Sequence, residues 1–141
     1  YKAFVKERIE YFDDIAKSNY IEIRSYLSDA SMMFNMTQLH RIVDNTISNA
    51  IKYSEEESHI EVMVKETDHA VIFRVVDHGI GIKDAHKVFD RYYREKHHKG
   101  GFGIGLTIVK SICDENGVKI DVNSISHKGT TFTYSFPKGA I

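Results

Sequence analysis

The sequence predicts an α+β domain in which helices cover one face of a mixed, mostly antiparallel sheet. Helical periodicity and strand alternation occur in separate segments, and the strand segments come mainly in pairs joined by short polar turns. A doubly wound parallel sheet would instead alternate each strand with a helix. The 141 residues suffice for one hydrophobic core. We therefore expect a two-layer α/β sandwich with about three helices on one face of the sheet.

In the first part of the chain, apolar residues at helical spacing predict a helix over residues 2–17. Alternation over residues 21–27 then predicts a strand, and the short apolar run at 32–34 suggests another. A second helix is expected to begin at Thr37, a residue type that favours the N-cap, and to end before the polar cluster at 54–57. This second helix has the clearest apolar stripe in the sequence.

The middle of the chain contains the clearest hairpin signal. Residues 59–67 and 70–77 both alternate apolar and polar side chains, with a short polar turn between them. A short helix is expected over residues 84–89. Residues 91–103 are rich in cations and glycines and lack an apolar period, which predicts a mobile loop.

The C-terminal part is expected to form a helix over residues 104–117, with Gly117 as the residue that ends it. Strands over 118–125 and 130–137 complete the predicted sheet. The sequence shows no repeat, linker or second domain, so residues 1–141 are predicted to form a single domain.

Composition narrows the range of functions. The net charge is −1, with acidic and basic residues interspersed, so no global field attracts nucleic acid or an anionic membrane. Cys113 is the only cysteine, which excludes an intrachain disulfide and a cysteine-based zinc site, and its helical neighbours predict a buried thiol. No apolar run approaches the roughly 20 residues that a membrane helix needs. We expect a cytosolic domain that is a fragment of a longer protein.

Three polar residues share one side of the second predicted helix. Asn45, Asn49 and Lys52 stand at positions i, i+4 and i+7, which places them on one stripe away from the apolar face. Amide oxygens can complete the oxygen shell of Mg²⁺, and a lysine can meet a phosphate. Taken alone, the stripe is more typical of an ordinary solvated helix face.

Two glycine-containing segments add to this stripe. Asp77 stands at the end of a predicted strand, where Gly79 and Gly81 allow a tight turn beside a ligand, and a buried carboxylate can accept a hydrogen bond from an exocyclic amine. The glycines of residues 100–105 run straight into a helix, whose N-terminus can face an anion. Individually, the first segment is also a common turn and the second a common flexible linker.

The order of these motifs resembles the catalytic domain of sensor histidine kinases, in the ATPase superfamily shared with gyrase, Hsp90 and MutL. The segment NTISNAIKYS is similar to the N box, DHGIGI to the first glycine box, VFDRYYRE to the phenylalanine box and GGFGIGL to the second glycine box. KGTTFTYSFP resembles the closing strand. The resemblance covers nearly the whole chain from about residue 4 and implies a Bergerat-type ATP-binding fold.

The resemblance implies roles for individual residues of the helix and of the first glycine box. Asn49 is the expected Mg²⁺ ligand with Asn45 as its supporting partner, and Lys52 is an expected phosphate contact. Tyr53 would form a wall of the adenine site, and Asp77 would read the adenine amine. Asn49 and Lys52, together with Arg91 of the following segment, are the residues expected to act in catalysis.

The same resemblance implies a mobile lid over about residues 91–103. Phe89 would anchor this lid, and Arg91 would give it a positive charge. Arg94 is a further candidate for the γ-phosphate, with a solvated lid charge as the alternative. The remaining expected nucleotide contacts are Gly79, Gly81, Ile82, Gly101, Gly103, Ile104, Gly105, Leu106 and Thr130.

The expected activity follows from the residue at position 45 and from the lack of an acceptor-histidine motif in this chain. Where ATP-hydrolysing relatives carry a glutamate that activates water, this chain has Asn45, which has no useful basicity. A histidine kinase needs no such base, because the acceptor imidazole is itself the nucleophile. None of the eight histidines lies in the acceptor motif of the family, and the adjacent His97 and His98 of the lid lack a third ligand for a metal.

The resemblance therefore implies binding of ATP with Mg²⁺ and transfer of the γ-phosphoryl group to a histidine on the kinase's own helical dimerisation domain. A response regulator would be an indirect partner, and the isolated domain would be a monomer in the cytoplasmic portion of a membrane-anchored sensor kinase. Two alternatives stay open. One is a nucleotide-binding regulatory module without transfer activity, and the other is an ATP-driven clamp, against which Asn45 counts.

Overall fold

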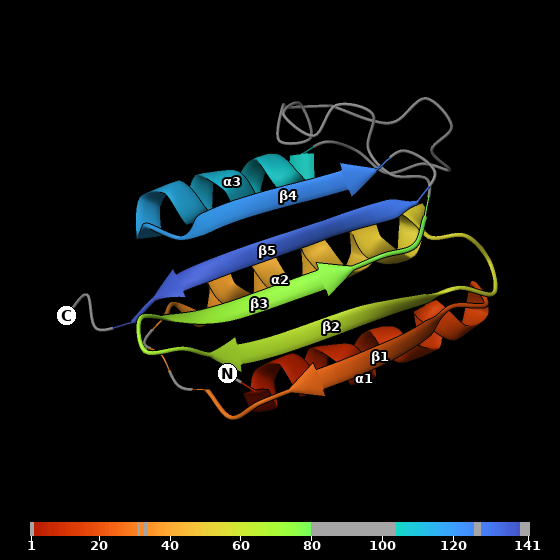
Figure 1. The fold of residues 1–141 in the computed structure, drawn as a ribbon, viewed down its shortest axis with the longest axis horizontal. Coiled ribbons are helices and arrows are strands. Elements are labelled where there is room, and N and C mark those ends of the chain that lie inside the picture. The colour runs from red at the N-terminus through yellow and green to blue at the C-terminus, as the bar shows by residue number, and fades with distance from the viewer. Residues whose placement is uncertain (1, 31, 33, 80–103, 126–127, 139–141) are drawn as a thin grey trace.

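The structure is a computed structural model that describes residues 2–30, 32, 34–79, 104–125 and 128–138. Three helices and five strands lie within these residues (Figure 1). The helices are α1 (Lys2–Ser18), α2 (Met36–Tyr53) and α3 (Ile104–Asn116). The strands are β1 (Glu22–Leu27), β2 (His59–Glu66), β3 (Ala70–Val76), β4 (Lys119–Ile125) and β5 (Gly129–Pro137). None of the three described helices combines the length and the apolar character needed to cross a membrane.

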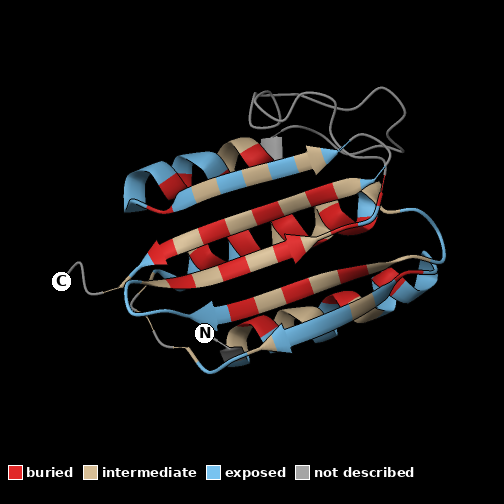
Figure 2. Ribbon diagram, in the orientation of Figure 1, coloured by how far each residue is buried: buried red, intermediate tan, exposed pale blue. Residues whose placement is uncertain are grey.

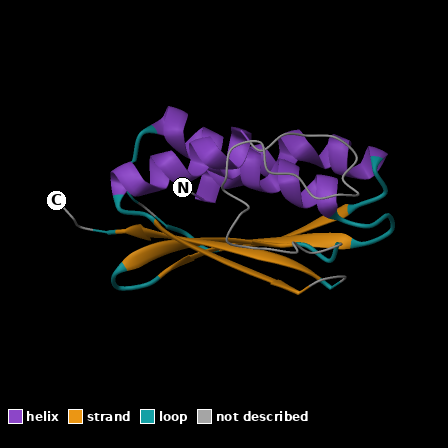
Figure 3. Cartoon of the chain, turned by 90° about the horizontal axis from the view of Figure 1, so that it is seen from above, coloured by secondary structure: helices purple, strands orange, loops and turns teal. Residues whose placement is uncertain are grey.

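The five strands form one sheet in the order β1-β2-β3-β5-β4. β1 pairs with β2 in parallel, and the other three pairings are antiparallel. All three helices lie on the same side of the sheet, so that the molecule has two layers (Figure 3). The predicted fold class is therefore confirmed, including the mixed, mostly antiparallel sheet.

The core lies between the helices and the inner face of the sheet. Along β2, β3 and β5 the buried residues alternate with partly exposed ones, which produces the red bands of Figure 2. The inner-face residues of these strands are Ile60, Val62, Val64, Val71, Phe73, Val75, Phe132, Tyr134 and Phe136. α2 contributes Leu39, Ile42, Val43, Thr46, Ile47, Ala50 and Ile51. Cys113 is buried as predicted, and burial raises the pKa of its thiol to about 12.

Two local predictions in the segment before α2 are wrong. The helix begins one residue before Thr37, because the side chain of Asn35 caps it by accepting a hydrogen bond from the Gln38 backbone N–H at 3.0 Å. Met32 and Phe34 are not in a strand. Phe34 instead packs edge-to-face against the buried Phe136, with ring centroids 5.2 Å apart. Its apolar side chain therefore extends the core instead of belonging to a strand.

A pair of ion contacts joins α1 to α2. The Arg8 guanidinium donates to both carboxylate oxygens of Asp44, at 2.8 and 2.7 Å, and lies over the ring of Tyr11. His40 contacts the same carboxylate at 2.6 Å. A bidentate arginine pair of this kind fixes orientation better than a single surface ion pair. The cluster therefore sets how α1 lies against α2, and it engages the carboxylate of Asp44.

A buried hydrogen bond connects α2 to the middle of the sheet. The Thr46 hydroxyl donates to the Ile42 carbonyl at 2.7 Å, and its oxygen lies 2.7 Å from the Tyr134 hydroxyl. Since Thr46 has a single hydroxyl proton, Tyr134 is the donor in the second bond. Burial raises the pKa of Tyr134, with desolvation as the main cause.

This pair predicts an asymmetric mutational response. Tyr134→Phe removes a donor and leaves Thr46 bonded to its helix, so we expect a loss of about 1 kcal/mol. Thr46→Val leaves the Tyr134 hydroxyl buried without its acceptor and is expected to cost more, about 1–3 kcal/mol. Urea unfolding of both single variants and of the double variant measures the difference. Equal losses, added together in the double variant, would contradict this pairing.

Candidate nucleotide-binding site

Asp77 lies immediately after β3 and is the most deeply buried carboxylate among the described residues, with 4% of its surface exposed. Its Oδ1 atom accepts hydrogen bonds from the backbone N–H groups of Gly79, at 3.0 Å, and Thr130, at 3.2 Å. Its own backbone N–H donates to the Thr130 carbonyl at 2.9 Å. The end of β3 and the start of β5 therefore fix the carboxylate from two sides.

Burial dominates the electrostatics of this carboxylate. Desolvation raises the pKa of Asp77 from 3.8 to about 6, while the two backbone hydrogen bonds and the neighbouring His78 act in the opposite direction. A carboxylate with so perturbed a pKa at the end of a strand is a functional-site candidate.

The second carboxylate oxygen distinguishes Asp77 from a purely structural residue. Within the described part of the chain, no hydrogen bond reaches Oδ2, although the residue is almost fully buried. Buried polar atoms in native proteins are normally satisfied. An N–H donor of a ligand, such as the exocyclic amine of adenine, fits this atom.

Two glycines hold the backbone around Asp77. A Cβ atom on Gly79 would lie 1.8 Å from the Tyr53 carbonyl oxygen, so the turn after β3 packs directly on the last turn of α2. A Cβ atom on Gly129 would lie 2.1 Å from the Asp77 carbonyl oxygen, and Gly129 has a φ of 131° that favours glycine. Gly79 is a predicted site residue, whereas no sequence pattern places Gly129 beside Asp77.

The predicted polar stripe lies on α2 as one continuous helix face. Asn45 and Asn49 are partly exposed and Lys52 is exposed, beside the buried row that includes Ile47 and Ala50. The Asn45 side chain donates to the Arg41 carbonyl, one turn earlier, at 2.8 Å. The amide nitrogen is thereby engaged with the helix, and the amide oxygen is an acceptor rather than a base.

The α2 stripe and Asp77 belong to one region of the molecule. Tyr53, the last residue of α2, is partly buried, and its carbonyl oxygen faces the backbone of Gly79. The contact brings the predicted adenine-reading carboxylate to the end of the helix that carries Asn49 and Lys52. Residues that are distant in the sequence therefore meet at one edge of the fold.

Two further predicted residues surround the same region. Leu106 is buried in the first turn of α3, and the Thr130 hydroxyl lies 2.9 Å from the Ser124 hydroxyl. Thr130 thus contacts Asp77 through its backbone rather than its side chain. Ile104 and Gly105 lie in α3. The remaining predicted residues, Gly81, Ile82, Phe89, Arg91, Arg94, Gly101 and Gly103, fall outside the described residues, as do the short helix over 84–89 and the lid over 91–103.

Comparison with known proteins identifies the family of this chain. Residues 35–140 match the family model of the histidine kinase-, DNA gyrase B- and HSP90-like ATPases. The match covers most of the chain and includes both α2 and Asp77. The chain therefore belongs to this ATPase family.

Similar bacterial proteins include sensor histidine kinases. The sensor histidine kinase WalK of Bacillus subtilis is 37% identical over 134 residues, covering 88% of this chain and 22% of WalK. The phosphate regulon sensor protein PhoR of Haemophilus influenzae is 34% identical over 110 residues, covering 74% of this chain and 26% of PhoR. The chain thus spans about a quarter of the length of these relatives.

Solved structures show the same fold. The histidine kinase AdeS of Acinetobacter baumannii superposes with a TM-score of 0.82 at 19% identity, covering 98% of this chain and 64% of the AdeS chain. The likeness to AdeS shows a shared fold, and the sequence relatives of this ATPase-family chain include a sensor histidine kinase.

Proposed function

We propose that this domain binds ATP with Mg²⁺ beside the C-terminal half of α2 and donates the γ-phosphoryl group to a histidine on a separate helical domain of the same kinase. The observation that carries the proposal is Asp77, whose Oδ1 accepts from two backbone N–H groups while no hydrogen bond from the described residues reaches Oδ2. A carboxylate in this state accepts a strong, charge-assisted hydrogen bond.

The α2 stripe supplies the groups for the phosphate end of the nucleotide. Asn49 would hold Mg²⁺ through its amide oxygen, with Asn45 as its neighbour one turn earlier, and Lys52 would contact a phosphate. The ion, when bound, neutralises charge on the phosphate oxygens. Phe89, Arg91, Arg94 and the glycines of residues 101–105 remain the proposed lid and phosphate contacts.

The chemistry of Asn45 and of the adjacent Asp44 favours phosphoryl transfer over ATP hydrolysis. Water activation needs a general base with an accessible lone pair. The Asn45 amide is not basic, and the adjacent Asp44 is paired with Arg8 and His40 at distances of 2.6–2.8 Å. In a phosphotransfer reaction the acceptor imidazole provides the nucleophile, so the domain needs only to position the nucleotide and stabilise charge.

Asn49→Ala is expected to lower the rate of phosphoryl transfer on the order of 100-fold, because it removes the protein ligand that positions the metal. The measurement supplies the domain and the matching phosphoacceptor domain with radiolabelled ATP and Mg²⁺ and follows labelling of the acceptor. Asn116→Ala is a matched control, since its amide contacts Gln38 and Ile112 at the other end of α3.

Two results would overturn parts of the proposal. If the wild-type domain bound nucleotide without labelling its acceptor, the regulatory-module alternative would replace the kinase reaction. If it hydrolysed ATP steadily without an acceptor, a clamp-type ATPase would be favoured, and the role given to Asn45 would be wrong.

A further inference from the structure

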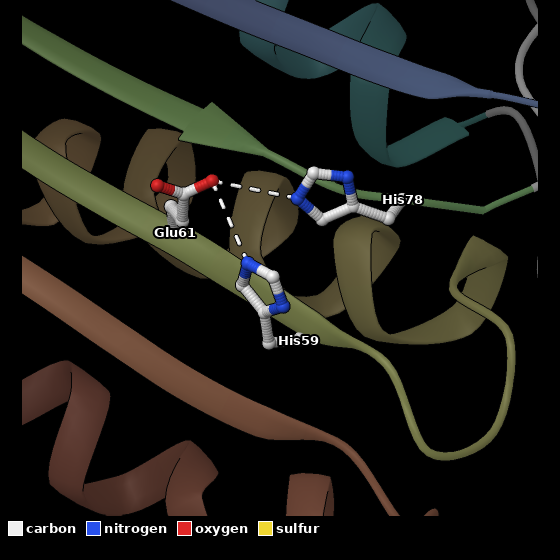
Figure 4. A group of neighbouring side chains, drawn as sticks. All are labelled: His59, Glu61 and His78. Carbon is white, nitrogen blue, oxygen red and sulfur yellow. Dashed lines mark hydrogen bonds and ion pairs between the residues drawn. The ribbon is translucent and has the colours of Figure 1, made fainter.

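The outer face of the sheet carries a cluster of two histidines and a glutamate that the nucleotide site does not use. His59 and Glu61 lie on β2 with their side chains on the face opposite the helices, and His78 follows β3 on the adjacent strand. Figure 4 shows both imidazole rings turned toward the same carboxylate. We propose that His59, Glu61 and His78 form a binding site for a divalent transition-metal ion of the Zn²⁺ type.

The distances in the cluster approach those of a tetrahedral metal site. The Glu61 Oε2 atom lies 3.4 Å from Nε2 of His78 and 3.7 Å from Nε2 of His59. Ligands at the usual Zn–N and Zn–O distances in a tetrahedron are about 3.3 Å apart. The three ligand atoms all lie within 4.8 Å of one another, so small side-chain rotations bring them to that spacing.

Arg24 shares the Nε2 atom of His59 with the cluster. The Arg24 guanidinium lies 3.4 Å from this nitrogen, and a guanidinium can only donate. The same nitrogen lies 3.7 Å from the Glu61 carboxylate. An ion bound by His59 and Glu61 would therefore replace Arg24 as the partner of Nε2.

The framework is suited to a site with an open position. Both histidine-bearing segments are fixed by the β2–β3 hairpin, in which Glu61 pairs with Val76, two residues before His78. The side chains are between 28% and 41% exposed, so an ion reaches them from solvent. Two imidazoles and one carboxylate suit zinc and similar ions rather than Mg²⁺, and they leave a fourth position for water.

Arg24 is the residue that competes with a metal. It is held 2.8 Å from Glu22 but is 47% exposed, so it can turn away from His59 when an ion enters. Its charge lowers the affinity of the site for a cation. If the cluster binds a metal ion, removing the charge of Arg24 should strengthen that binding. If the cluster only binds Arg24, the same change should produce no metal binding.

The test is a calorimetric titration of the untagged, chelator-treated domain with ZnCl₂ in a non-coordinating buffer. We expect one equivalent of Zn²⁺ to bind, and His59→Ala, Glu61→Ala and His78→Ala each to weaken binding by at least about tenfold. Arg24→Gln is expected to tighten binding severalfold. His69→Ala, in the exposed turn between β2 and β3, is the matched control and should leave binding unchanged.

A second variant distinguishes this site from the other histidines of the chain. The double change His97→Ala and His98→Ala removes the adjacent pair in the sequence and should leave Zn²⁺ binding intact. Visible absorption after Co²⁺ replacement provides an independent signature of a four-coordinate site, which His78→Ala should abolish. The proposal is overturned if no Zn²⁺ binds, or if binding survives His78→Ala but is lost with His97 and His98. None of these outcomes depends on nucleotide binding.

Discussion

Asp77→Asn is expected to weaken ADP binding by about 10- to 100-fold while making the nucleotide-free domain more stable near neutral pH. The loss of affinity follows from how the side chain is held. Two backbone N–H groups occupy one side of the carboxylate, so the amide oxygen of asparagine takes that position. The amide N–H₂ group then faces the ligand amine. Both groups are hydrogen-bond donors, whereas in the wild type the carboxylate oxygen accepts from the ligand amine.

The gain in stability follows from the buried charge. The pKa of Asp77 is about 6 in the folded state and 3.8 in the unfolded reference, and this difference corresponds to at most about 3 kcal/mol. Because the folded-state pKa is the higher one, the folded state binds more protons between these values. The contribution of Asp77 is therefore most favourable below pH 3.8 and is lost as the pH rises through about 6.

The measurement combines calorimetric titration with ADP and urea unfolding of both proteins from about pH 4 to about pH 8, a range that spans the folded-state pKa. The free energy of unfolding of Asp77→Asn relative to wild type should rise through this range, since asparagine does not titrate. A difference that stays constant with pH would show that the charge of Asp77 does not oppose folding. Unchanged ADP affinity would remove Asp77 from the binding site.

Gly79→Ala is expected to destabilise the domain by about 3 kcal/mol or more, at the upper end of the cost of overpacking. The new methyl group would lie 1.8 Å from the Tyr53 carbonyl oxygen and 2.6 Å from its carbonyl carbon. Both contacts are with backbone, so no side-chain rotation relieves them. Either the last turn of α2 or the turn after β3 must move, and Asp77 and Asn49 then lose their relative positions.

Gly117→Ala is the matched control for this substitution. Gly117 ends α3 with a φ of 67°, and a Cβ atom added to it would meet nothing within 4 Å. Alanine there should lower the stability of the folded domain only by the strain of a left-handed backbone, about 1–2 kcal/mol. ADP affinity should not change. Thermal unfolding and ADP titration of both variants test the contrast, and equal effects would show that the contact between Gly79 and α2 is not tight.

Much of the architecture was predictable because it depends on patterns within single elements. The apolar stripe of α2 and the alternation of β2, β3 and β5 indicate which side chains face the core. The hairpin of β2 and β3 follows from a short polar turn between two alternating segments. Gly117 marks the end of α3 because few other residues adopt its backbone conformation.

The wrong predictions concern segments in which local sequence permits several structures. Thr37 and Asn35 are both good N-caps, and only the folded chain shows that the Asn35 side chain reaches the Gln38 N–H. The apolar run around Met32 and Phe34 is typical of a strand, but tertiary packing of Phe34 on Phe136 explains it equally well. Apolar character alone does not distinguish these two cases.

The candidate site was predictable in its parts but not in its assembly. Asp77, Asn49 and Gly79 each belong to a motif, whereas the position of Gly129 against the Asp77 carbonyl depends on the pairing of β3 with β5. The cluster of His59, Glu61 and His78 likewise depends on the register of β2 and β3. Contacts across strands require a register, and a single sequence does not display one.

The parallel strand β1 has a consequence for the boundary of the domain. β1 pairs with β2 along its whole length, from Glu22 opposite His59 to Leu27 opposite Val64, and so makes β2 an interior strand. The family match begins at residue 35, after α1 and β1. A chain cut at that point would leave β2 with a row of unpaired backbone groups beside Ile60, Val62 and Val64, which is a template for edge-to-edge association. By pairing with β2, β1 therefore covers a sheet edge that would otherwise favour self-association.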